Sequence, residues 1–348
     1  MMYKISDSRI NDLFAALNSE MALYLPVEAN GTVQFAPWVP DAAVRLDALN
    51  TAMSPKGLFF PHVENIAAFK VQKKEITIDN APTHNEPFAV FGVRACDAQS
   101  LSLLDRVFLS EPVDTFYEAR RRNGVVITAA CFRPEESCFC GTFDIDATAP
   151  SGDIATWFAD GTLYWLGLTE RGYELTKKIE EFLFPIADED ETTLTKHKTK
   201  SKDIFTKLPF SDLNLKGFTP EKLMEKFNSA KWQELYPTCL ACGTCTFVCP
   251  TCHCYDIQDT GTDGNISRKR CWDSCMYSDF TLMAHGNPRM SQLERFRQRF
   301  MHKLIYFPEN NDGQYACTGC GRCVKKCPVS MNIAKVSKAL EDGENVYC

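Results

Sequence analysis

The sequence predicts an α+β protein in which a mixed α/β domain precedes a mainly helical domain. Short apolar runs in the first half are typical of buried strands, a polar and charge-segregated stretch follows near the middle, and helical periodicity dominates after it. We therefore expect an α/β domain over 1–186, a linker or exposed loop over 187–218 and a helical domain over 219–348. A chain of 348 residues is long enough for two separate cores.

The expected elements of the first domain follow its apolar pattern. The runs FAVFGV at 88–93 and VVITAA at 125–130 predict buried strands. The pair Asp160-Gly161 suits a type I′ turn and predicts a hairpin. Helices are expected over 97–110, 113–122 and 169–184.

The second half begins with the charge-segregated run. Residues 188–191 are DEDE and the basic run TKHKTKSKD follows, which predicts a linker. In the region beyond, Leu293, Phe296, Phe300 and Leu304 fall on one helical stripe and are expected in the core. Helices are expected over 220–230, 272–285, 290–305 and 331–342.

Composition argues against several classes of protein. The formal net charge of −7 leaves no overall basic footprint for nucleic acid. No stretch approaches the roughly 18–20 apolar residues of a membrane span. The N-terminal residues are amphipathic and lack the basic head and apolar run of a signal peptide, so we expect a cytoplasmic protein.

Seventeen cysteines dominate the functional signal. A disulfide scaffold suits short secreted chains, whereas these cysteines are clustered at metal-ligand spacing. The motif Cys-x2-Cys-x2-Cys-x3-Cys-Pro occurs twice, at 239–250 and 317–328. Zinc, the alternative, commonly uses two separated Cys-x2-Cys pairs.

This motif predicts two [4Fe-4S] clusters with crossed ligands. Three thiolates of each copy bind one cubane, and the fourth, beside proline, binds the neighbouring cluster. Gly243 and Gly321 follow the second cysteines and suit a tight turn. The expected ligand sets are Cys239, Cys242, Cys245 and Cys327 for one cluster, and Cys317, Cys320, Cys323 and Cys249 for the other.

Four cysteines of the first half predict a third [4Fe-4S] cluster. Cys96 and Cys131 each follow a predicted strand, so both thiols leave the same sheet edge if those strands are neighbours. The Cys-Phe-Cys loop at 138–140 could join them there. The alternative is a set of buried free cysteines. The expected ligands are Cys96, Cys131, Cys138 and Cys140.

A last group follows the first motif, and its role stays open. Such thiols could complete another site, supply alternative ligands to a nearby cluster or fill the core around a cofactor. Its members are Cys252, Cys254, Cys271 and Cys275.

The segments CLACGTCTFVCPTCHCYD, RCWDSCM, AHGNPR and CTGCGRCVKKCP together resemble an iron–sulfur electron-transfer subunit family. It includes the A subunit of anaerobic sulfite reductase, the β subunit of cytoplasmic sulfhydrogenases and a dicluster subunit of flavin oxidoreductases that feed heterodisulfide reductase. GVRACD and Cys-Phe-Cys match its N-terminal part, and the resemblance is weakest over 1–85 and 141–230. It implies a cytoplasmic relay in anaerobic metabolism, between a flavoprotein that oxidises NAD(P)H and a catalytic redox subunit.

The motifs that are missing favour the same hypothesis. No Gly-x-Gly-x-x-Gly follows a strand, so we expect neither flavin nor nicotinamide in this chain. No nucleophile–base arrangement is evident, so the leading hypothesis is a non-catalytic electron-transfer subunit, although its standing as an enzyme stays open. One alternative is a self-contained reductase with a substrate-reducing site at Cys252, Cys254, Cys271 and Cys275. Another is an iron–sulfur sensor, which the lack of a DNA-binding motif disfavours.

One region carries a surplus of positive charge. Between residues 268 and 303 there are eight Lys or Arg and three acids. Such a cluster predicts either a docking surface for an acidic partner or a solvated helix face.

Overall fold

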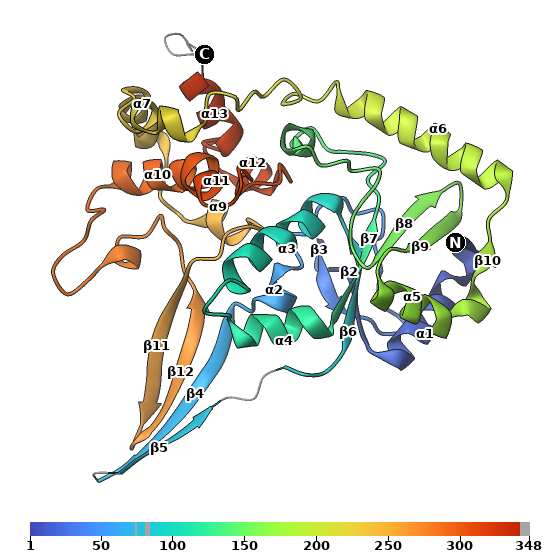
Figure 1. Cartoon of the computed structure of the whole chain (residues 1–348), viewed down its shortest axis with the longest axis horizontal. Helices are drawn as coiled ribbons and strands as arrows, with labels where there is room; N and C mark the ends of the chain where they lie inside the picture. The colour runs from blue at the N-terminus through green and yellow to red at the C-terminus, as the bar shows by residue number, and fades with distance from the viewer. Residues whose placement is uncertain (74, 81–83, 342–348) are drawn as a thin grey trace.

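The computed structural model describes residues 1–73, 75–80 and 84–341. The larger of its two sheets is mixed and has eight strands, in the order β10-β1-β9-β8-β7-β6-β2-β3 (Figure 1). The neighbours β2, β6, β7 and β8 run parallel, and the outer strands pair antiparallel. The strands are β1 (Met2–Ser6), β2 (Ala22–Ala29), β3 (Thr32–Pro37), β6 (Phe88–Val93), β7 (Gly124–Ala129), β8 (Ile154–Ala159), β9 (Thr162–Gly167) and β10 (Phe184–Pro185).

Helices cover both faces of this sheet because its central strands are apolar on both sides. Ala89 and Phe91 of β6 pack with residues of α1 and α5 on one face. Phe88 and Val90 pack with residues of α2, α3 and α4 on the other. These helices are α1 (Ile10–Glu20), α2 (Lys56–Phe59), α3 (Ala95–Phe108), α4 (Thr115–Asn123) and α5 (Glu170–Lys178).

Most predicted elements of this half are confirmed. The strand expected at 88–93 is β6, and the one expected at 125–130 is β7, one residue earlier. Asp160 and Gly161 adopt positive φ values of 48° and 77° in the turn between β8 and β9. The helix expected over 169–184 ends at Lys178, and a short 3-10 turn at Glu180–Phe182 follows it.

The expected linker contains an 18-residue helix, α6 (Asp188–Phe205). Its first turn is acidic, which complements the helix dipole, and the Asp190 carboxylate accepts the backbone N–H of Ala187 at 2.8 Å. Leu194 is buried in a cluster with Trp157 and Tyr164. The cap at Asp190 and the buried Leu194 therefore stabilise a helix in the segment where the charge pattern predicts a loop.

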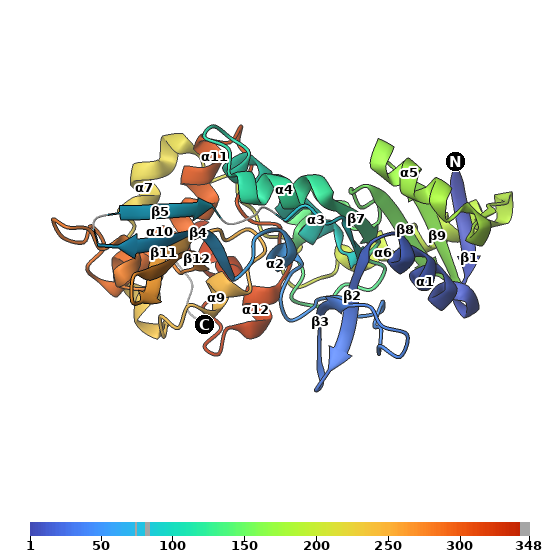
Figure 2. The ribbon, with the colours of Figure 1, turned by 90° about the horizontal axis from the view of Figure 1, so that it is seen from below.

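A second, four-stranded sheet extends away from the rest of the molecule (Figure 1). Figure 2 shows the same strands from below. It joins two distant parts of the chain, because β12 pairs antiparallel with β4. At its base the buried Arg270 guanidinium donates to Glu64 at 2.5 Å and also to Asp114. The strands are β4 (Val63–Gln72), β5 (Glu75–Asn80), β11 (Tyr255–Thr262) and β12 (Asn265–Trp272).

The β11–β12 hairpin corrects the expectation that helices fill the region between the two motifs. Asp263 and Gly264 form its turn with φ values of 53° and 77°, the same Asp-Gly signal that predicts the β8–β9 turn. The prediction of a helix over 272–285 is also wrong. Its only helical piece is a short 3-10 turn at Asp279–Thr281.

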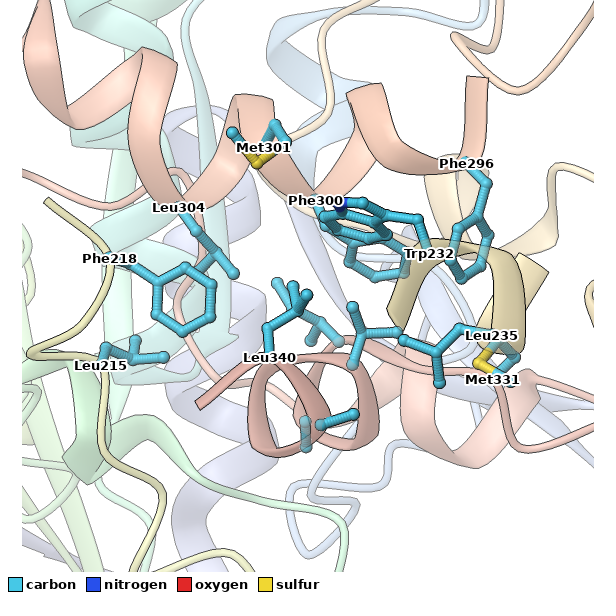
Figure 3. Packing of buried hydrophobic residues seen from close by; sticks show 14 of the residues in the cluster. Leu215, Phe218, Trp232, Leu235, Phe296, Phe300, Met301, Leu304, Met331 and Leu340 are labelled. Atoms are coloured by element: carbon cyan, nitrogen blue, oxygen red, sulfur yellow. The ribbon is translucent and has the colours of Figure 1, made fainter. Parts of the chain in front are cut away.

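The C-terminal part has a core of its own (Figure 3). Three of the four stripe residues are confirmed in the core, since Phe296, Phe300 and Leu304 are each 1% exposed. The fourth, Leu293, is only partly buried against the same core. Phe296 and Phe300 lie on α10 (Gln292–Met301), and Leu304 lies on the π-helical turn η7 (His302–Tyr306) that continues it. The elements are η4 (Pro220–Lys222), α7 (Leu223–Phe227), α8 (Lys231–Leu235), η5 (Tyr236–Thr238), α9 (Thr244–Phe247), α10 (Gln292–Met301), η7 (His302–Tyr306), α11 (Phe307–Glu309), α12 (Arg322–Lys326) and α13 (Ile333–Glu341). None of the helices in the described ranges is long and apolar enough to cross a membrane.

Candidate iron–sulfur site

The two ferredoxin-type motifs have the same backbone geometry. In each, the residue before and the residue after the second cysteine adopt positive φ: Ala241 at 52° and Gly243 at 73°, Gly319 at 59° and Gly321 at 79°. This turn directs a backbone N–H at the first sulfur of the motif. The donor–acceptor distance is 3.4 Å to Cys239 Sγ and 3.5 Å to Cys317 Sγ. Such bonds favour the thiolate that an iron–sulfur cluster requires.

The first motif lies beside the last cysteine of the second. Burial raises the pKa of Cys239, and the nearby Cys245 and Cys327 thiols raise it further. The backbone N–H of Met331 donates to Cys327 Sγ at 3.2 Å. Cys242, the remaining expected ligand of this set, is exposed.

The second motif correspondingly lies beside the last cysteine of the first. Burial raises the pKa of Cys317 to about 12, and the neighbouring Cys249 and Cys323 thiols contribute to the rise. Cys249 also lies near Cys320 and Cys323. These contacts bring together seven of the eight expected ligands, all except Cys242, in the two crossed groups that the motif predicts.

A buried cation tests whether these groups fit an anionic cluster. Arg299 is 2% exposed, and its Nε and Nη1 atoms have no hydrogen-bond partner. Burial acts to lower its pKa, but its neighbours, including Cys245 of one group and Cys323 of the other, raise the pKa overall. Among the residues that the structure describes, no carboxylate pairs with it. A buried, unpaired guanidinium is costly unless negative charge lies close by. A cubane with four thiolate ligands carries such a charge, so these residues fit [4Fe-4S] clusters.

The N-terminal cysteines meet at the edge of the parallel sheet. β6 and β7 are parallel neighbours, and Cys96 and Cys131 lie just beyond their carboxyl ends. Burial raises the pKa of Cys131 and of Cys140 to about 12 each. All four cysteines of this group line one cavity together with Cys320 of the second motif: Cys96, Cys131, Cys138 and Cys140.

A buried cation also accompanies this N-terminal group. Arg94 donates to the carbonyls of Leu46, Ala48 and Ala130, while its Nε atom has no partner. The guanidinium lowers the pKa of Cys131 against the effect of burial. The N-terminal group thus shares with the ferredoxin-type groups a buried guanidinium that is incompletely paired.

An ion pair joins the N-terminal group to the second motif. Arg322 and Asp97 are 3% and 1% exposed and form two hydrogen bonds, of 2.5 and 2.7 Å. Each residue follows a cysteine by one or two positions, Asp97 after Cys96 and Arg322 after Cys320. This bridge holds the two thiol groups against one another.

The four cysteines that follow the first motif, Cys252, Cys254, Cys271 and Cys275, do not all lie together. The Cys254 thiol accepts a hydrogen bond from Cys275, which lowers the pKa of Cys254 to about 7. Cys252 lies beside Cys249 and near Cys254. Cys271 occupies a central position of β12, opposite Asp256 on β11 and Val63 on β4.

The basic region of the sequence is not a single surface. Arg270, Arg299 and Lys303 are all buried, and Lys303 donates to Thr251 Oγ1 and to the Ala316 carbonyl at 2.8 Å each. The eight basic residues as a whole therefore form neither a docking surface nor a solvated helix face. Sequence reasoning missed that cations lie beside the thiols, because a run of charges carries no signal for burial.

The thiols do not converge on a point. Within the described ranges, no three His, Cys, Asp or Glu side chains gather closely enough to hold a single metal ion. In a cubane each thiolate binds a different iron, so the ligands surround a cluster instead of one ion.

These features define the chain as an iron–sulfur electron-transfer protein, and comparison with known proteins agrees. Residues 238–331 match the family of 4Fe-4S dicluster domains. Over 344 residues the chain is 33% identical to the sulfhydrogenase 2 subunit beta of Pyrococcus furiosus, covering 98% of each sequence. No solved structure matches the chain. The chain belongs to the family of sulfhydrogenase β subunits, as the resemblance of its motifs predicts.

Proposed function

We propose that this chain relays single electrons between a flavoprotein subunit that oxidises NAD(P)H and a catalytic redox subunit of a cytoplasmic complex. Bound [4Fe-4S] clusters would supply the one-electron chemistry. The chain's own residues would hold and insulate them. The observation that carries the proposal is the contact between successive thiol groups, each beside a buried and incompletely paired cation.

The proposed ligand sets follow these contacts. The N-terminal set of Cys96, Cys131, Cys138 and Cys140 borders the second motif at Cys320. The second motif shares Cys249 with the first, and the first shares Cys327 with the second. In this proposal the three groups form a series, with the N-terminal set at one end.

The other end of the series reaches the surface. Cys242 is exposed, and Leu240 beside it is 62% exposed. The hydroxyl of Tyr277, itself 38% exposed, donates to the Cys242 carbonyl at 3.3 Å. A partner that docks here would approach a thiol ligand more closely than a partner could at a place where the ligand cysteines are buried. We propose this edge as one place where a redox partner binds.

The competing hypothesis of a self-contained reductase is less well supported. A substrate-reducing site needs an opening large enough for substrate, but Cys275 is only 8% exposed and Cys271 lies apart on β12. Nor does the sequence contain a dinucleotide-binding motif, which would hold a nicotinamide cofactor as the hydride donor.

Anaerobic mixing experiments test the proposal. The purified chain with its clusters should stay oxidised when NAD(P)H is added alone, and its visible absorbance should bleach when the flavoprotein subunit is also present. Addition of the oxidised catalytic subunit should then restore the absorbance. Oxidation of NAD(P)H, or reduction of a sulfur substrate, by the isolated chain would contradict the proposal and favour the self-contained reductase.

A further inference from the structure

Three cysteines outside the ferredoxin-type motifs come together at the base of the β11–β12 hairpin. The backbone N–H of Asp273 donates to the Cys254 carbonyl at 3.0 Å, so the segments before β11 and after β12 run side by side. This places Cys275, two residues after Asp273, beside Cys254. Cys252 precedes Cys254 by two residues and lies within reach of both Cys249 and Cys254.

This group shares a Cys-x-Cys pair with the N-terminal group. Cys252-x-Cys254 and Cys138-x-Cys140 each place two thiols on one loop, and further thiols come from the ends of strands. In the N-terminal group those strands are β6 and β7, and here Cys275 follows β12. Both groups therefore combine a Cys-x-Cys loop with a cysteine that follows a strand, and both lie outside the ferredoxin-type motifs.

A buried lysine supplies a second and independent observation. Lys56 is 2% exposed, and its ammonium group donates to the carbonyls of Cys249 and Cys252 at 3.1 and 2.7 Å. It also lies 3.7 Å from the centroid of the Trp272 ring. No carboxylate in the described part of the chain forms an ion pair with it. Burial of an ammonium group without an anionic partner is unfavourable, so negative charge is expected beside it.

We propose that Cys252, Cys254 and Cys275 hold a further iron–sulfur cluster, with Lys56 as its counter-charge. A disulfide would use only two of the three thiols and would carry no charge to compensate the lysine. Three thiolates can bind three irons of a [4Fe-4S] cluster, and the remaining iron takes a ligand that is not a cysteine. The site deepens the proposed function, because it lies beside Cys249 of the second ferredoxin-type group.

Iron analysis of the full-length chain, reconstituted under anaerobic conditions, tests this site. The triple variant Cys252→Ala, Cys254→Ala, Cys275→Ala should contain about four fewer irons and acid-labile sulfides per chain than the unaltered protein. It should also lack one signal in the electron paramagnetic resonance spectrum of the reduced protein. The matched control is Cys271→Ala, on the same hairpin, which should leave iron content unchanged. Full iron content in the triple variant, or an equal loss in Cys271→Ala, would overturn the three-thiol site.

A second variant keeps the test valid if the triple variant does not fold. Lys56→Met retains all the thiols, so iron content should stay unchanged while the reduction potential of one cluster becomes more negative. The affected signal should be the one that Cys275→Ala removes. Unchanged potentials in Lys56→Met would contradict the assigned counter-charge. Both readouts concern this chain alone, so they can succeed even if the proposed partners are wrong.

Discussion

The ferredoxin-type groups and the N-terminal group bring thiols together in different ways. In each ferredoxin-type motif, three cysteines lie on one short loop whose shape depends on local positive φ angles. In the N-terminal group, Cys96 and Cys131 lie 35 positions apart in the numbering and meet because β6 and β7 are parallel neighbours. The first kind of site is a property of the loop, and the second is a property of the sheet.

The two ferredoxin-type loops also differ in what they touch. A Cβ atom on Gly319 would lie 2.4 Å from the Phe139 carbonyl oxygen, which belongs to the N-terminal cysteine loop. The equivalent residue of the first motif is Ala241, which already carries a Cβ. The second motif is therefore fitted closely to the N-terminal group, whereas the first has room at this position.

The largest expected effect separates the two kinds of site by iron content. Cys131→Ala should remove about four irons per chain and leave the ferredoxin-type signals in place, because no ferredoxin-type ligand is altered. Cys245→Ala should remove a similar amount and leave the N-terminal signal. Iron and sulfide analysis with electron paramagnetic resonance would measure both. Full iron content in Cys131→Ala would mean that the N-terminal thiols are free core cysteines.

The next effect concerns the bridge between the two kinds of site. Asp97→Ala leaves the buried Arg322 unpaired and should lower the free energy of unfolding by about 3–5 kcal/mol. Urea unfolding of the cluster-loaded protein would measure it. Arg106→Ala is the control, because Arg106 pairs with the 85% exposed Asp312 and its loss should cost at most about 1 kcal/mol. Equal losses in the two variants would show that the buried bridge does not hold the halves together.

A smaller effect tests the difference between the two loops. Gly319→Ala should destabilise the protein by about 1–3 kcal/mol from backbone strain, with additional cost from displacement of the Phe139 carbonyl. Ala241→Gly should change stability by less than this, since it only removes a methyl group from a residue at positive φ. Thermal unfolding of both variants provides the measurement. A larger loss in Ala241→Gly would reverse the comparison.

The smallest effect lies at the exposed edge of the first motif. Tyr277→Phe removes one hydrogen bond to the Cys242 carbonyl and should cost about 0.5–1.5 kcal/mol or less, because the site is solvent-accessible. Iron content should not change. Iron loss in this variant would mean that the first loop depends on its surroundings as strongly as the second does.

The predictable features were those with local signals. The β6 and β7 strands, the helices α3 and α4 and the β8–β9 turn follow from apolar runs and an Asp-Gly pair. The condition set for the N-terminal group, that its two strands be neighbours, is met in the structure. The crossed ligand sets of the ferredoxin-type cysteines follow from the spacing of the motif and stay a prediction.

The features that escaped prediction depend on distant contacts. The β11–β12 hairpin carries its own Asp263-Gly264 signal, but its pairing with β4 joins residues as far apart as Glu64 and Arg270, 206 positions along the chain. The buried state of Arg299, Lys303 and Lys56 is equally invisible in a sequence, where each reads as a surface charge. Their burial becomes understandable only when the thiols around them are known.

The shared four-stranded sheet also has a consequence for how the protein is made. The ribosome releases β4 and β5 long before β12 exists, and synthesis at about 5–20 residues per second makes the delay roughly 10–40 s. Throughout that interval β4 presents an unpaired edge next to the exposed Ile76 and Ile78 of β5, the kind of edge that invites association with other chains. We expect dilution or a bound chaperone to reduce such association until Trp272 has emerged. Expression of the N-terminal half alone would make that temporary state permanent.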